Sequence, residues 1–114
     1  MKFFLKVNCT SNNTILTLTT SKLKTLTTIS TGKVGFRGAK RSTFIGAEKA
    51  ATEVSNFVKK FKRPAKFIIL YKGFGRGKRA IIAGLKKRKV AILKILNTTQ
   101  TPHNGCRPSK KRRL

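Results

Sequence analysis

The sequence predicts a single α/β domain in which a mixed five-stranded sheet carries two helices and is followed by an extended basic C-terminal tail. Its length of 114 residues suits one compact domain. Its hydrophobic fraction of 39% is enough for one core. Strand-like apolar runs also alternate with stretches of helical spacing in the order β-β-β-α-β-α-β. We therefore assign residues 1–97 to a mixed α/β domain and residues 98–114 to the tail.

The first three elements are predicted to be strands. Phe3–Cys9 and Thr14–Thr20 are rich in β-branched and apolar residues. The cluster Thr-Ser-Asn-Asn at 10–13 between them is typical of a hairpin turn. Thr25–Thr31 is a more polar third strand. Three strands in succession indicate an antiparallel meander.

A loop and a long helix are expected next. In Gly32–Arg41 glycines are interleaved with cations and one phenylalanine, which predicts a loop. Ser42 or Thr43 is a suitable N-cap for the helix, and Pro64 should end it. The apolar residues that recur at helical spacing are Ala47, Ala50, Ala51, Val54, Phe57, Val58 and Phe61.

Two more strands flank a second helix. Lys66–Tyr71 is a nearly continuous apolar run, typical of a strand covered on both faces. Residues 72–79 form a second glycine–cation loop, and Val90–Leu96 is predicted to be a further buried strand. Each helix should make a right-handed crossover between parallel strands. The short helix Ala80–Lys87 should pack through Ile81, Ile82 and Leu85.

The charge balance predicts a polyanionic partner. The chain has 28 lysines and arginines against two acidic residues, a formal net charge of +26. A free protein with a solvated basic face normally carries compensating carboxylates, which this chain lacks, so a nucleic acid is the expected partner. No apolar run approaches the roughly 20 residues of a membrane span. Residues 1–4 lead straight into a strand-like run, so no signal or transit peptide is expected.

The residues offer little for catalysis or metal binding. The predicted order resembles the ribonuclease H topology, whose chemistry uses several carboxylates to hold two metal ions. Glu48 and Glu53 would lie about 140° apart around one helix and could not hold a metal together. Glu48 is instead expected to complement the helix dipole. Cys9 and Cys106 have no metal-site spacing, and reduced thiols are favoured over a disulfide, which stays open.

Two further patterns do not predict a catalytic or nucleotide-binding site. His103 and Cys106 stand in the tail without an orienting acid, so they do not predict a nucleophile–base pair. The glycines at 73, 75 and 77 match neither phosphate-binding nucleotide motif. They could serve a tight turn or bring the backbone to RNA phosphates. We therefore expect no enzyme activity, catalytic residue, cofactor, metal or small-molecule substrate.

The tail carries a specific resemblance. Thr101–Leu114 resembles closely the C-terminal signature of the small-subunit ribosomal protein number eleven family. The likeness runs from about Leu5 to the end. The sequence departs from the family pattern in three places. Phe74 and Arg76 stand where prolines are usual, and the segment Asn97–Gln100 lacks the usual acidic residue. The basic extension that the family often carries before its first strand is missing. Matching segments occur in the family's order at Ser11–Ile15, Gly35–Gly38, Arg41–Thr43, Lys72–Gly73 and Gly75.

The resemblance implies a structural constituent of the ribosome that supports translation from the platform of the small subunit. There it would bind central-domain small-subunit ribosomal RNA, close to neighbouring platform proteins and to messenger RNA near the exit path. Phe36 and Phe74 could stack on bases or simply pack within their loops, and His103 could stack or hydrogen-bond on RNA. The expected RNA-binding residues are Asn12, Asn13, Lys33, Phe36, Arg37, Lys40, Arg41, Lys72, Phe74, Arg76, Lys78, Arg79, His103, Asn104, Arg107, Lys110, Lys111, Arg112 and Arg113.

The sequence leaves two other functional classes and the cellular compartment open. A histone-like DNA-packaging protein is the alternative from another class, and a ribonuclease H-like enzyme is the third hypothesis. Abundant lysine, threonine and isoleucine with almost no acid suggest an AT-rich genome. This composition fits an organelle-encoded protein of the mitochondrial ribosome before one of the plastid. A bacterial ribosome or an imported, processed protein is the remaining alternative.

Overall fold

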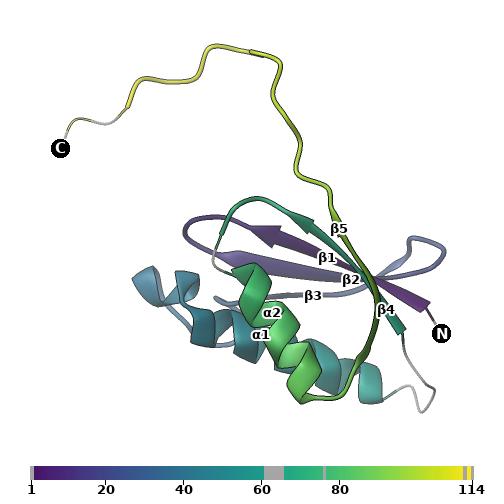
Figure 1. The fold of residues 1–114 in the computed structure, drawn as a ribbon. Coiled ribbons are helices and arrows are strands. Elements are labelled where there is room, and N and C mark those ends of the chain that lie inside the picture. Colours follow the sequence, from purple (N-terminus) through teal and green to yellow (C-terminus); the bar gives the residue numbers. More distant parts are fainter. Residues whose placement is uncertain (1, 61–65, 76, 112, 114) are drawn as a thin grey trace.

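The fold is a mixed five-stranded sheet with two helices on one face (Figure 1). The structure, a computed structural model, describes residues 2–60, 66–75, 77–111 and 113. In space the strands follow the order β3-β2-β1-β4-β5. The elements are β1 (Lys2–Cys9), β2 (Thr14–Thr20), β3 (Thr25–Ser30), the 3₁₀ helix η1 (Gly38–Ser42), α1 (Phe44–Lys59), β4 (Lys66–Lys72), α2 (Gly77–Lys87) and β5 (Ala91–Asn97).

The strand pairings give four of the five strands one common direction. β2 pairs antiparallel with both β1 and β3, whereas β4 pairs parallel with β1 and with β5. The predicted fold class and the N-terminal meander are thereby confirmed. Because β1, β3, β4 and β5 run the same way, their carboxyl ends meet at one end of the sheet, and both helices begin there. We call this end the carboxyl edge.

Strand alternation and small helix residues build the core. In β1 the odd-numbered residues from Phe3 to Cys9 are buried under the helices, while Lys2, Lys6 and Asn8 are exposed on the other face. α1 lies against β2 and β3, and α2 lies against α1 and β1. Ala47, Ala50 and Ala51 are fully buried in α1, and these small side chains leave room for the second helix beside it. The opposite face of the sheet carries no helix (Figure 1).

Two strand predictions were wrong about burial. In β4, Phe67 and Ile69 are buried, but Ile68 and Leu70 are only half-buried because no helix or strand of the described residues covers that face. β5 is an edge strand with no buried residue, although its sequence is as apolar as a core strand. The large side chains of Leu93, Ile95 and Leu96 are 42–47% exposed. The helices cover the centre of the sheet and leave its last strand largely to solvent.

The element boundaries agree closely with the sequence. β1 begins one residue before the predicted start, β3 ends one residue before the predicted end, and β5 lies one residue further along the chain, while larger or other differences concern η1, α2 and β4. Thr43 is the N-cap of α1, as predicted, and its hydroxyl accepts a hydrogen bond from the Gly46 N–H at 3.3 Å. The predicted loop 32–41 contains part of η1, and α2 begins at Gly77 rather than Ala80. The Lys66 strand extends one residue further than predicted, to Lys72. The predicted helix residues Phe61 and Pro64 lie outside the described residues.

Glu48 does not act at the helix start. α1 begins at Phe44 and has no acidic residue in its first turn, so the predicted dipole role of Glu48 is wrong. The Glu48 carboxylate instead forms an ion pair with Lys87 in the last turn of α2. This contact joins the two helices across their interface. The Lys87 side chain is mostly exposed, so the pair should contribute only about 0.2–1 kcal/mol.

Candidate nucleic-acid interface

The carboxyl edge collects several of the segments predicted to bind RNA. Each of them follows or precedes a strand at that end of the sheet, so the parallel topology brings them together. They are the hairpin turn at 10–13, the segment 31–43, the loop 72–75 and the first residues of the tail.

Thr31 joins the hairpin turn to the segment 31–43. Its N–H donates to the Thr14 carbonyl at 3.2 Å, and its buried hydroxyl lies 2.8 Å from the Arg41 carbonyl and beside the Asn13 Oδ1. Asn13 Oδ1 also accepts from the Thr14 N–H at 2.8 Å. The side chain of Asn13 is thus engaged within the fold, whereas the neighbouring Asn12 is exposed.

The loop 72–75 is held against the hairpin by two glycines. Gly73 has a φ of +100°, in the region that favours glycine, and a Cβ there would overlap the Cys9 carbonyl oxygen. A Cβ on Gly75 would overlap the Thr10 carbonyl oxygen. Close packing therefore explains these glycines directly. The same packing fixes the positions from which Lys72 and Phe74 extend.

The tail starts as an extension of this assembly. The Thr98 N–H and hydroxyl both donate to the Tyr71 carbonyl, at 2.8 and 3.1 Å, and the Gly73 N–H donates to the Thr99 hydroxyl at 3.0 Å. Beyond these contacts the chain leads away from the domain (Figure 1). The described residues from 100 to 113 are all exposed.

The two candidate stacking residues lie in different surroundings. Phe74 is 93% exposed at the tip of the loop 72–75. Phe36 is half-buried, and the Lys49 ammonium lies 5.9 Å from its ring centroid. Only Phe74 presents a whole aromatic face to a partner.

The predicted cations also divide by position. Lys78, in the first turn of α2, is half-buried, and its ammonium lies 3.9 Å from the Tyr71 ring centroid. Lys33 is exposed, but its ammonium reaches back to donate to the Thr28 carbonyl at 3.1 Å. Arg76 and Arg112 lie outside the described residues. Besides Asn12, Lys33 and Phe74, the exposed predicted residues are Arg37, Lys40, Arg41, Lys72 and Arg79 in the domain, and His103, Asn104, Arg107, Lys110, Lys111 and Arg113 in the tail.

A hollow on the uncovered face of the sheet extends this basic region. It has a volume of about 420 Å³ and lies between β1 and the start of the tail. Lys6, Asn8 and Gln100 were not among the predicted site residues. The alternation in β1 could have found the first two, because residues opposite a buried Leu5 and Val7 must face the other side. The lining comprises Lys6, Val7, Asn8, Thr17, Leu70, Lys72, Thr98 and Gln100.

The two thiols differ in environment. Cys9 is buried at the end of β1, beneath the loop 72–75, and Cys106 is exposed in the tail. Burial raises the pKa of the Cys9 thiol, and the nearby positive charge of Lys78 opposes that shift in part. Both thiols are free.

The features of the fold define a class of protein. In the part of the chain that the structure describes, no three His, Cys, Asp or Glu side chains form a group that could hold a metal. None of the described helices is long and apolar enough to cross a membrane. The chain is a strongly basic α/β protein, with a formal net charge of +26.

Comparison with known proteins identifies the family. The family model described as Ribosomal protein S11 matches residues 4–113. The chain belongs to the ribosomal protein S11 family.

Several relatives span most of both chains. The small ribosomal subunit protein uS11m of Marchantia polymorpha is 43% identical over 106 residues, 92% of this chain and 83% of its own. The uS11c protein of Tupiella akineta is 41% identical over 109 residues, and uS11 of Buchnera aphidicola is 39% identical over 108 residues. Each of these two alignments covers 95% of this chain and 82% of the relative.

Family membership confirms the resemblance inferred from the tail. The chain is a structural, non-enzymatic constituent of the small ribosomal subunit. Mitochondrial, chloroplast and bacterial relatives match it at similar identity. The DNA-packaging and ribonuclease hypotheses are replaced by this assignment.

Proposed function

We propose that the chain binds small-subunit ribosomal RNA through the carboxyl edge of its sheet and through residues 98–114, at the platform of the subunit. It would lie there among neighbouring platform proteins and close to messenger RNA near the exit path. The observation that carries this proposal is the convergence of the predicted segments on one edge. Both acidic residues of the chain, Glu48 and Glu53, lie elsewhere, on α1.

The physical reason is electrostatic. A phosphate backbone is attracted to a surface that carries only cations, and each neutralised phosphate releases counterions. Lys72, Arg79 and the exposed cations of 37–41 supply such a surface on the folded domain. The hollow beside Lys6 and Lys72 continues it onto the uncovered face of the sheet. Phe74 adds a face on which an unpaired base can stack, worth about 1–3 kcal/mol.

The tail has a separate role in this proposal. None of its described side chains after Thr99 is buried in the domain, so the cations among them are free to follow RNA. Pro102 and Pro108 hold parts of it in extended conformations. We further propose that this ribosome is mitochondrial, since the uS11m protein of Marchantia polymorpha is among the most similar relatives found. The abundance of lysine, threonine and isoleucine, which suggests an AT-rich coding sequence, supports the same compartment.

Salt dependence tests the RNA contacts. Truncation after Thr101 removes five cations, and we expect it to flatten the log–log slope of affinity against salt by roughly 3–4 units. A finer comparison replaces Lys110 and Lys111 by alanine, which should flatten the slope by about 1.4–1.8 units. The matched control replaces Lys22 and Lys24, in the β2–β3 turn at the opposite end of the sheet.

The control removes the same charge and should leave the slope nearly unchanged. Circular dichroism of every variant checks that the fold is retained. Equal slopes for the tail pair and the control pair would show that the tail does not touch phosphate.

A further inference from the structure

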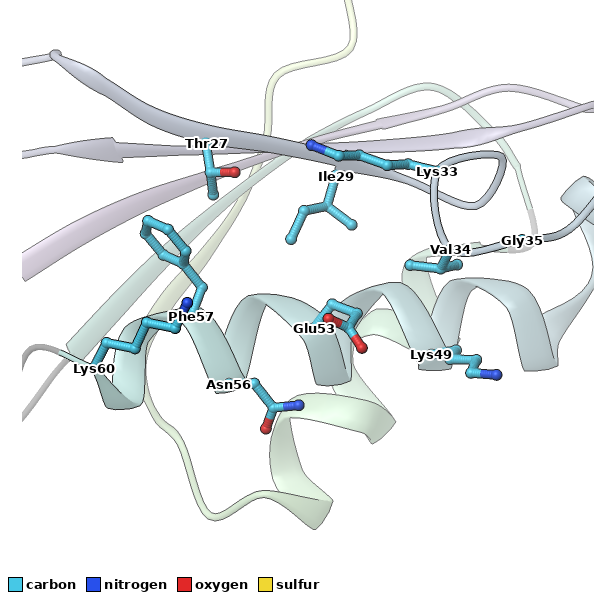
Figure 2. Close-up of a pocket in the computed structure, with 10 residues that line it drawn as sticks. All are labelled: Thr27, Ile29, Lys33, Val34, Gly35, Lys49, Glu53, Asn56, Phe57 and Lys60. Carbon is cyan, nitrogen blue, oxygen red and sulfur yellow. The ribbon is translucent and has the colours of Figure 1, made fainter.

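A groove between β3 and α1 has a lining unlike that of the carboxyl edge. Its volume is about 630 Å³. Figure 2 shows Ile29 pointing from β3 toward α1, with the Phe57 ring and Val34 at either side. These three side chains give the groove an apolar floor. Its remaining lining is Thr27, Lys33, Gly35, Lys49, Glu53, Asn56 and Lys60.

The rim of the groove carries both signs of charge. Lys33 lies along β3, Lys49 comes from α1, and Lys60 is the C-cap residue of that helix (Figure 2). Glu53 is one of only two acidic residues in the chain, and it is exposed within this lining. The other, Glu48, is paired with Lys87 on α2. The groove is therefore a place where RNA would meet a carboxylate.

An RNA backbone fits this lining poorly. Two like charges about 4 Å apart repel by roughly 1 kcal/mol in water and about 4 kcal/mol near a protein surface. Sugar and phosphate are also mostly polar and offer little apolar surface to cover Ile29 and Val34. A polypeptide offers apolar side chains together with charges of either sign. Three lysines against one glutamate favour a peptide with more carboxylates than cations.

The free side of β3 limits how such a peptide can bind. Since the Thr31 N–H points to Thr14 on β2, the backbone groups of Thr28 point away from β2. The Thr28 carbonyl is already occupied by the Lys33 ammonium, and a register shift interrupts β2–β3 pairing near Leu18 and Thr19. Both features discourage the addition of another strand. Docking should therefore rest on side chains.

We propose that this groove receives a segment of a neighbouring small-subunit protein, with one apolar side chain on the floor and a flanking carboxylate at Lys49 or Lys60. The proposal rests on membership of the small subunit and is independent of the RNA contacts proposed above. It assigns two adjoining surfaces to different partners. The rest of the carboxyl edge would face RNA, and the groove between β3 and α1, which includes Lys33 and Val34 of the segment 31–43, would face protein.

A photocrosslink in assembled small subunits tests the proposal. A benzophenone amino acid replaces Asn56, which is exposed at the rim of the groove (Figure 2). Irradiation should give an adduct with a ribosomal protein, and peptide mapping should place it in a segment with an apolar residue beside an acidic one. An adduct with ribosomal RNA, or the absence of any adduct, would overturn the proposal.

Charge reversal supplies the second measurement. In the crosslinking background, Lys49→Glu with Lys60→Glu should reduce the protein adduct at least fivefold, because both cations line the groove. Lys59→Glu with Lys86→Glu is the matched control, since Lys59 on α1 and Lys86 on α2 are both exposed cations outside the groove. It should leave the adduct unchanged, and an equal loss in both variants would refute the specific contact. The salt slope of RNA binding, measured on the same variants, reports separately on the proposed function.

Discussion

The segments 32–41 and 72–75 have similar compositions and different structures. Each combines glycines, one phenylalanine and at least one cation. The first closes a turn after β3 and enters η1, so Phe36 is half-buried beneath Lys49. The second is pressed against Cys9 and Thr10, and it leaves Phe74 almost wholly exposed.

The difference shows that glycines serve the two loops in different ways. In the segment 32–41, positive φ values at Gly35 and Gly38 turn the chain in open space, where a Cβ would meet nothing nearby. In the loop 72–75, the glycines remove bulk so that two backbones can touch. In the segment 32–41, the open turn allows Phe36 to fold back against the domain. In the loop 72–75, the close packing leaves Phe74 pointing outward.

The largest effect should come from Gly73→Ala. The new Cβ would overlap the Cys9 carbonyl, and alanine would have to adopt a left-handed φ. Left-handed backbone and overpacking together should lower the free energy of unfolding by roughly 2–5 kcal/mol. Gly35→Ala is the matched control, because Gly35 has a similar φ but open space around it. Denaturant unfolding of both variants measures the difference, and equal losses would show that close packing of the loop is unimportant.

The two phenylalanines should respond to alanine in opposite measurements. Phe74→Ala should weaken RNA binding by about 1–3 kcal/mol through lost stacking, with little change in stability because the ring touches almost nothing. Phe36→Ala should lower the free energy of unfolding by about 1–3 kcal/mol, less than a fully buried phenylalanine. Affinity and unfolding are measured on both variants. A Phe74 variant that loses stability and keeps its affinity would reverse our assignment of the two segments.

Sequence patterns predicted the local elements better than their burial. β2 has the predicted ends, and the Thr43 cap was foreseen, because turn residues and capping act within a few positions along the chain. The exposure of β5 was missed, since Val90–Leu96 is as apolar as a core strand and only the position at the sheet edge leaves it uncovered.

The same limit applied to the candidate site. The cations could be listed from the sequence, but the engagement of Asn13 by Thr14 and Thr31 depends on contacts between separate segments. Glu48 was misread for a related reason, because its partner Lys87 lies 39 residues away. Lys6 and Asn8 were within reach of simple strand alternation.

The last prediction uses Cys9 as a reporter of the loop 72–75. Cys9 is buried beneath Gly73 and Gly75, while Cys106 in the tail is exposed and serves as an internal control. An alkylating reagent near neutral pH should modify Cys106 quickly and Cys9 slowly, because burial both blocks access and raises the pKa of the Cys9 thiol.

The raised pKa also sets the direction with pH. The unfolded chain loses the Cys9 proton first as pH rises, so this thiol favours the folded state at lower pH and that contribution is lost through the alkaline range. In Gly73→Ala, an opened loop should speed Cys9 labelling while leaving Cys106 unchanged. The ratio of the two rates, read by mass spectrometry, removes differences in reagent concentration. Equal labelling of both cysteines in the unmodified protein would mean that the loop does not cover β1, and the contrast between the two glycine–cation segments would fail with it.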